Sequence, residues 1–155
     1  MIAVSDSGPL HYLRLIGCEF VLSDLFERVL LPEAVYAELH HEHTPQIVSD
    51  WISDPPDWLE IVPVEASEPP KRLGKGEWEA IRLALSLPQG VTLLTDDNNA
   101  RGYAEQLGLH VVGTLGMLVH ASSGNKLHLR EVVERLLGTN FRANPRLIRT
   151  ILGEE

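Results

Sequence analysis

The segment VTLLTDD, residues 91–97, carries the strongest structural signal in the chain. Its apolar residues run almost consecutively instead of alternating with polar ones, which is typical of a strand buried on both faces of a sheet. Two aspartates follow directly, and a helix is expected over residues 98–107, up to Gly108. A buried strand that leads into a helix is the basic unit of a parallel α/β sheet.

The same pattern recurs along the rest of the chain. Further short apolar strands are expected at residues 2–6, 28–32, 59–64 and 110–113. Other helices are expected at residues 9–16, 21–27, 32–42, 45–53, 76–87, 114–123, 129–138 and 145–153. Strands that alternate with helices predict a parallel sheet covered by helices. Because no interdomain linker is evident, residues 1–155 are expected to form one domain.

The composition limits the classes of protein that fit the chain. Its 155 residues, 44% of them hydrophobic, are enough to bury a sizeable core. No apolar run is long enough to cross a bilayer and no basic segment precedes the apolar start, so neither a membrane span nor a signal peptide is expected. The single cysteine, Cys18, suits a reducing, cytoplasmic compartment. The net charge of −9 argues against a broad electrostatic attraction to nucleic acid and is compatible with carboxylates around bound metal.

Several acidic residues are expected at one edge of the sheet. Asp6 ends the first strand, and Asp96 and Asp97 end the strand that contains VTLLT. Glu77 lies in the first turn of a helix, at the edge where the strands end, and Glu38 falls beside the apolar stripe of its own helix. Sites in open parallel sheets form at the carboxyl ends of the strands, so these five acids are the candidate site residues.

The helix GEWEAIRLALSL, residues 76–87, has an acid on its apolar face. On a helical wheel, Glu77 projects near the centre of the apolar arc, whereas Glu79 falls on the opposite side, toward Arg82. A carboxylate within an apolar arc needs a partner or a cation, or it loses its charge. Glu77 is therefore the candidate site residue of this helix, and Glu79 is expected to point outward.

Carboxylates that converge on one pocket repel one another. Two unit charges 4 Å apart cost about 4 kcal/mol at an effective dielectric of 20. Mg²⁺ or Mn²⁺ would offset this repulsion, and such an ion can activate water and stabilise a phosphoryl transition state. The acids thus predict hydrolysis of a phosphodiester. Simpler interpretations stay open, because Asp6, Asp96 and Asp97 could cap helices, Glu77 could serve its helix dipole and Glu38 could be solvated.

Five segments occur in the order seen in PIN-domain proteins. They are VSDSGPLHYLRLIG (4–17), VLLPEAVYAEL (29–39), GEWEAIRLA (76–84), LLTDDNNAR (93–101) and VVGTLGMLVHA (111–121). The chain most closely resembles the toxin-like branch related to the VapC ribonucleases of type II toxin–antitoxin systems. This resemblance covers nearly the whole length and implies a three-layer α/β/α sandwich with a central parallel sheet. It also implies an endoribonuclease that depends on Mg²⁺ or Mn²⁺.

The resemblance assigns catalytic and metal-binding roles residue by residue. The family's first acid matches Asp6, the second matches Glu38, and the third matches Glu77. The third acid is often Asp in VapC-like enzymes, so the longer Glu is a departure from the pattern. The fourth acid falls on Asp96 or Asp97: the T-x-D form common in the family favours Asp97, whereas Asp96 lies closer to the strand end.

Residues beside the acids are candidates for supporting contacts. Ser7, Thr95 and Asn98 could orient the acids or contact phosphate, although capping or turn roles suit them equally. The basic residues expected near this edge, which could bind phosphates or be ordinary surface charges, are Lys71, Arg72, Lys75 and Arg101. The family further implies an RNA substrate, a cognate antitoxin protein and a homodimer.

Other classes of protein compete with this interpretation. The main alternative is a catalytically silent PIN-fold module that binds a protein partner and cleaves nothing. Receivers and dehalogenase-type phosphatases are disfavoured, because AVSDSG (3–8) holds one acid and no D-x-D motif. A zinc site is not expected at His40, His41 and His43, because they lack the i, i+4 spacing that aligns two imidazoles on a helix.

Overall fold

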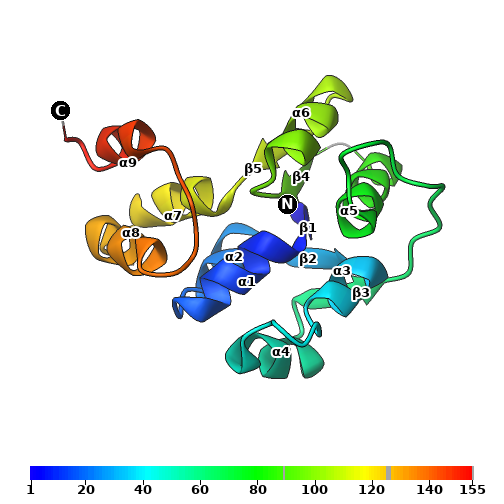
Figure 1. Cartoon of the computed structure of the whole chain (residues 1–155), viewed down its shortest axis with the longest axis horizontal. Helices are drawn as coiled ribbons and strands as arrows, with labels where there is room; N and C mark the ends of the chain where they lie inside the picture. The colour runs from blue at the N-terminus through cyan, green and yellow to red at the C-terminus, as the bar shows by residue number, and fades with distance from the viewer. Residues whose placement is uncertain (89, 125–126, 155) are drawn as a thin grey trace.

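A parallel sheet forms the centre of the molecule. The computed structural model describes residues 1–88, 90–124 and 127–154. Within them the strands are β1 (Ile2–Ser5), β2 (Arg28–Pro32), β3 (Leu59–Val62), β4 (Val91–Leu94) and β5 (His110–Val112). They form one sheet in the order β3-β2-β1-β4-β5, and every neighbouring pair is parallel (Figure 1). The predicted α/β fold with a central parallel sheet is therefore confirmed.

Helices follow nearly every strand. They are α1 (Ser7–Leu15), α2 (Phe20–Leu25), α3 (Glu33–Glu38), α4 (Gln46–Ser53), α5 (Lys75–Ser86), α6 (Asn98–Gln106), α7 (Thr114–Ser122), α8 (Leu129–Leu137) and α9 (Pro145–Ile151). The first helix begins two residues earlier than expected, because the Asp6 carboxylate caps it at Ser7. The third ends at Glu38 rather than at residue 42, and β4 stops at Leu94, three residues before the expected end of its strand.

The two faces of the sheet carry separate cores, because successive side chains of a strand point to opposite faces. Ala3 belongs to the cluster packed with α1, α2, α4, α7 and α8, whereas its neighbour Val4 belongs to the cluster packed with α5 and α6. Leu94 and Leu93 divide in the same way between the two clusters. This alternation gives the three layers of the α/β/α sandwich. None of the helices in the described residues is long and apolar enough to span a membrane.

The strand order places a topological switch at β1. From β1 the chain builds outward through β2 to β3, then returns through α5 to add β4 and β5 on the other side (Figure 1). The carboxyl ends of β1 and β4 are therefore adjacent, with Ser5 aligned to Leu94 in the register. A crevice at such a switch is where open α/β sheets bind ligands, and Asp6 and residues 95–97 follow these two strands.

Candidate active site

Asp6 is the most buried acid of the site, with 7% of its surface exposed. Its Oδ1 accepts a hydrogen bond from the Ser7 backbone N–H (2.8 Å), and its Oδ2 accepts one from the Thr95 hydroxyl (3.0 Å). Burial raises the pKa of Asp6 to about 6, against the opposing effect of these two bonds. The nearby charges of Glu38 and Asp97 raise it further, which places three carboxylates within electrostatic reach of one another.

Glu38 reaches the site from the last residue of α3. Its carboxylate lies against Gly76, where an added Cβ atom would stand only 2.8 Å from Glu38 Cδ. Burial raises the pKa of Glu38, whereas hydrogen bonds with the Ser7 side chain and the Gly76 backbone act to lower it. Glycine at the start of α5 therefore lets the two helices approach closely enough for Glu38 to join the other acids.

Glu77 extends from the first turn of α5. Its Oε1 accepts the backbone N–H of Gly74 (3.0 Å), so the helix-capping role left open by the sequence is present. Its Oε2 is buried and has no hydrogen-bond partner. Burial raises the pKa of Glu77 to about 7; a hydrogen bond that only protonated Glu77 can donate to Asp97 raises it further, as do the charges of Asp6 and Asp97. The second oxygen of Glu77 is thus an unsatisfied acceptor within the cluster.

The two aspartates after β4 have different surroundings. Asp97 caps α6, because its Oδ2 accepts the Ala100 N–H (2.8 Å), and it also interacts with Asp6 and Glu77. Asp96 turns toward α7, where both of its oxygens accept hydrogen bonds from Thr114, from the backbone N–H (2.7 Å) and from the hydroxyl (2.6 Å). Burial raises the pKa of Asp96, although Thr114 and Arg101 oppose the shift. The geometry therefore favours Asp97 as the fourth acid of the cluster.

The supporting residues expected from the sequence divide into three groups. Ser7 and Thr95 interact directly with the acids, and the Thr95 hydroxyl also accepts the Asp97 N–H (3.2 Å). Asn98 and Arg101 line a groove next to Asp96, and the Arg101 guanidinium donates to the Val111 carbonyl (3.4 Å). Lys71, Arg72 and Lys75 are exposed at and just before the start of α5.

The prediction that Glu79 points outward toward Arg82 is wrong. Glu79 is only 6% exposed, and its Oε1 accepts the backbone N–H of Ala34 at the start of α3 (3.2 Å). The Arg82 guanidinium instead lies over the ring of Trp78, 5.7 Å from its centroid. A helical wheel shows one apolar arc, but α5 contacts the sheet on one side and α3 on another, so Glu79 is buried although Arg82 and Ser86 on the same polar side are exposed. Nothing in the sequence of α5 alone indicates this second contact.

Sequence reasoning also missed Gly76 and Thr114. Both contribute through close approach to an acid, Gly76 to Glu38 and Thr114 to Asp96. Their only sequence signal is a small residue at the first turn of a helix. The histidines that follow α3 bond locally instead: His40 contacts the Tyr36 carbonyl and the Ser53 hydroxyl, both at 2.9 Å.

The donor chemistry of the cluster suits a hard divalent cation. Four carboxylates, Asp6, Glu38, Glu77 and Asp97, lie within electrostatic reach, and one buried oxygen of Glu77 lacks a partner. In the described part of the chain, however, no three His, Cys, Asp or Glu side chains are arranged so that they could hold a metal ion as they stand. The residues fit the ion by charge and donor type, and their side chains would have to move to ligate it.

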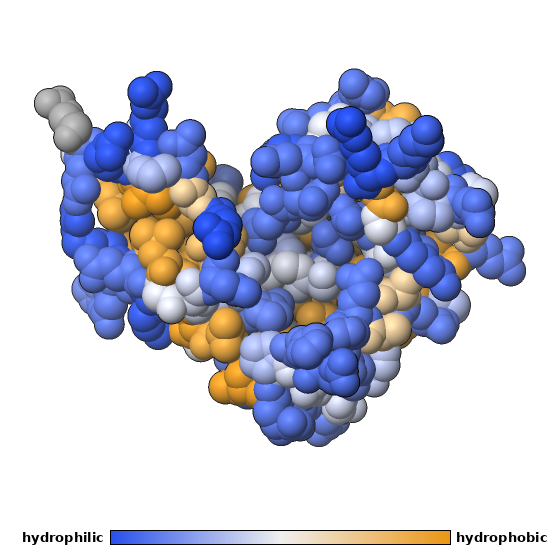
Figure 2. All heavy atoms as spheres, viewed as in Figure 1, coloured by the Kyte–Doolittle hydropathy of each residue, from blue (hydrophilic) through white to orange (hydrophobic). Residues whose placement is uncertain are grey.

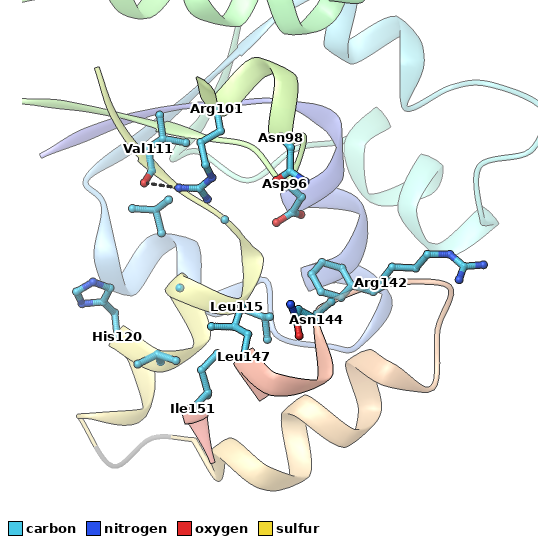
Figure 3. Close-up of a pocket in the computed structure, with 16 residues that line it drawn as sticks. Asp96, Asn98, Arg101, Val111, Leu115, His120, Arg142, Asn144, Leu147 and Ile151 are labelled. Atoms are coloured by element: carbon cyan, nitrogen blue, oxygen red, sulfur yellow. Dashed lines mark hydrogen bonds between the residues drawn. The ribbon is translucent and has the colours of Figure 1, made fainter. Parts of the chain in front are cut away.

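A groove of about 720 Å³ opens beside Asp96 (Figure 3). Asp96, Asn98 and Arg101 lie at one end, and Leu115, Leu147 and Ile151 give the other end an apolar lining. In the space-filling view, apolar side chains gather over the lobe formed by α7, α8 and α9, next to a hollow that separates this lobe from the rest of the molecule (Figure 2). The groove therefore begins at Asp96, the neighbour of Asp97 in the sequence, and none of the four cluster acids lines it.

Comparison with known proteins identifies the fold. The chain matches the family model described as DUF3368, a PIN domain, over residues 2–154. It is similar to the solved structure of a PilT N-terminus domain protein from the hyperthermophilic archaeon Sulfolobus solfataricus P2, with 16% identity and a TM-score of 0.51. The likeness covers 93% of this chain and 100% of the other, and at this identity it shows the fold alone. No match was found among curated proteins.

The family model spans all the elements that build the acidic site, from β1 to α9. PIN domains are typically nucleases and generally use divalent metal ions. The parallel sheet, the switch at β1 and the match over residues 2–154 agree with one another, and the chain belongs to the PIN-domain family.

Proposed function

We propose that the chain is an endoribonuclease that depends on Mg²⁺ or Mn²⁺ and acts as the toxin of a toxin–antitoxin pair. The observation that carries the proposal is the cluster of Asp6, Glu38, Glu77 and Asp97 at the switch point of the sheet, where burial and then the neighbouring carboxylates raise the pKa of Asp6 and of Glu77. Like charges held this close cost free energy that a bound cation would offset. The PIN family supports nuclease chemistry at the coarser level.

Each residue of the cluster has a defined part in the proposed reaction. Asp6, Glu38, Glu77 and Asp97 would hold the cation, which when bound supplies positive charge beside the phosphate and makes water more acidic. Thr95 and Ser7 orient Asp6 and Glu38 through their hydroxyls. Glu77 Oε2 is the candidate acceptor for a proton from the attacking water, because this oxygen receives no hydrogen bond and burial raises the pKa of Glu77 to about 7 in the metal-free chain. The water oxygen bonds to phosphorus as the bond from phosphorus to the 3′ oxygen breaks; the departing 3′ oxygen takes up a proton from solvent, and Glu77 returns its proton to solvent.

The decisive experiment measures RNA cleavage by the purified chain with Mn²⁺, with Mg²⁺ and with excess EDTA. Asp6→Asn should reduce metal-dependent cleavage by at least 100-fold, because it removes one charge from the cluster while keeping an oxygen that can accept from Thr95. Asp57→Asn is the matched control, because Asp57 is exposed and lies outside the cluster. An unchanged rate in Asp6→Asn, or cleavage that survives EDTA, would refute the proposal.

The toxin role adds expectations about partners and location. We expect a cognate antitoxin that lays a segment along the groove beside Asp96, a homodimer, and a cytoplasmic location. The apolar lining of the groove at Leu115, Leu147 and Ile151 supports a protein segment there. Co-expression with any small reading frame found next to the gene tests this role: restored growth and a stable complex would support it, and toxicity that no neighbouring reading frame neutralises would count against it.

A catalytically silent PIN module is the second candidate. One observation favours it, since no three acids within the described residues are already arranged to hold a metal ion. A silent module would bind Mn²⁺ weakly or not at all and would leave every RNA in a complex pool intact. Metal-dependent cleavage that Asp6→Asn abolishes would exclude it.

A further inference from the structure

The helix that carries Glu38 has no cap of its own. Helix α3 spans only six residues, Glu33–Glu38, and Pro32 at its N-cap position offers no side-chain hydrogen bond. A helix this short has little intrinsic stability, and its first backbone N–H groups need acceptors from elsewhere. The position of Glu38 therefore depends on contacts that other elements make with α3.

Glu79 of α5 supplies the missing acceptor. Its Oε1 receives the Ala34 N–H at 3.2 Å, and the residue is 6% exposed. Ala34 is the second residue of α3, so the carboxylate lies where the partial positive charge of the helix N-terminus is strongest. Glu79 acts on α3 as an N-cap side chain does, although it comes from 45 residues further along the chain.

Helix α5 also contacts the opposite end of α3. Gly76 lies against the Glu38 carboxylate and hydrogen-bonds to it through its backbone. Gly76 and Glu79 are three positions apart, and neighbours at that spacing share one helical face. A single face of α5 thus holds the first turn of α3 through Glu79 and its last residue through Gly76.

We propose that Glu79 is a positioning residue, which fixes α3 to α5 and thereby sets where the Glu38 carboxylate lies relative to Glu77. The proposal rests on the metal-dependent function proposed above for the site itself. The charge of Glu79 lies close enough to Glu38 to raise its pKa. A third carboxylate beside Glu38 and Glu77 adds repulsion, and an apolar residue at position 79 would pack between the helices without this cost. Its hydrogen bond to α3 gives a reason for its presence.

The test compares Glu79→Ala, which removes the acceptor, with Glu79→Gln, which keeps an oxygen that can accept the Ala34 N–H. Ala84→Gly, in the same helix away from the acids, is the control for destabilisation of α5. The first measurement is Mn²⁺ affinity by calorimetry or electron paramagnetic resonance, at a temperature where all variants are folded. Glu79→Ala should weaken Mn²⁺ binding by about tenfold, with Glu79→Gln and Ala84→Gly within about threefold of the parent chain.

The second measurement is hydrogen exchange in EDTA, which needs neither metal nor activity. Glu79→Ala should speed exchange of the Ala34 amide and the rest of α3, whereas Ala84→Gly should not. A parent chain that binds no Mn²⁺ would refute the proposed function, and the exchange data would still test Glu79. Three results would overturn the positioning role. The first is equal Mn²⁺ affinity in Glu79→Ala and Ala84→Gly, and the second is equally weak Mn²⁺ binding in Glu79→Gln and Glu79→Ala. The third is unchanged hydrogen exchange in α3 of Glu79→Ala.

Discussion

Asp6 keeps its proton at a pH where an ordinary aspartate has released it. Burial is the main cause of its pKa of about 6, and the charges of Glu38 and Asp97 add to it. Glu77 shows the same effect, with a pKa of about 7. Each group is accommodated in the folded chain most easily when it is neutral. The metal-free fold is therefore under electrostatic stress at neutral pH, and this stress is concentrated on the residues that would hold a cation.

We expect the metal-free chain to lose stability as pH rises. Between about pH 4 and 6 the folded chain keeps the Asp6 proton that the unfolded chain has released, so the free energy of unfolding falls with rising pH. At ~1.4 kcal/mol per pKa unit, the loss from Asp6 is on the order of 2–3 kcal/mol, complete above about pH 7. Urea unfolding in EDTA at pH 4 and pH 8 measures most of it. Asp6→Asn should flatten the dependence, and an equal slope in both proteins would contradict the assignment.

Added Mn²⁺ should reverse this pH trend. The cation binds the ionised carboxylates, so its affinity should rise from pH 5.5 to pH 8 as Asp6 and Glu77 release their protons. At a concentration about 100 times its dissociation constant, it should stabilise the fold by about 2.7 kcal/mol. Thermal unfolding at both pH values tests this, with Glu77→Gln as the variant that keeps an acceptor for Gly74. Equal Mn²⁺ stabilisation at pH 5.5 and pH 8 would contradict the prediction.

At the scale of elements, the site depends on how closely α3 and α5 approach. Gly76→Ala introduces a Cβ that overlaps the Glu38 carboxylate, although alanine is the better helix former. The overlap should displace Glu38, lower Mn²⁺ affinity and RNA cleavage by at least tenfold, and leave the fold intact. Gly102→Ala in α6 is the matched control, because a Cβ there meets nothing within 4 Å. It should raise stability by about 0.5–1 kcal/mol without changing activity.

The elements also show what the sequence could and could not predict. The strands were predictable, because a run such as VTLLT is apolar on both faces, and so was the closeness of Asp6 to residues 95–97, because β1 and β4 end at the same edge of the sheet. The roles of Gly76 and Glu79 were not, because they depend on the separation between two helices far apart in the chain. The different surroundings of Asp96 and Asp97 were likewise not predictable, because Asp96 accepts two hydrogen bonds from Thr114 of α7, which is far from Asp96 in the sequence.

At the scale of the whole molecule, the charge is unevenly distributed. The net charge is −9, yet residues 139–153 hold three arginines, Arg142, Arg146 and Arg149, and no acid. Arg142 of this segment lines the groove beside Asp96, as does Phe141, whose ring packs edge-on against Tyr12 at 5.0 Å; Arg146 and Arg149 follow in α9 and do not line it. A single RNA strand that reaches the acid cluster could place its phosphates on these arginines and a base beside Phe141. The acidic composition therefore does not exclude an RNA substrate.

The basic segment predicts which arginine side chains contribute to RNA binding. The double variant Arg142→Ala and Arg146→Ala should weaken binding of a fluorescent single-stranded RNA, measured by anisotropy in EDTA so that no cleavage occurs. The slope of log K against log salt should become shallower by about 0.7 for each phosphate that an arginine no longer neutralises. Arg130→Ala is the control, because Arg130 is exposed on the neighbouring helix but is already paired with Glu154. If the double variant and Arg130→Ala show the same affinity and the same salt slope, the strand does not follow this basic segment. Weaker binding in the double variant alone would place the path of the RNA between α9 and the acids.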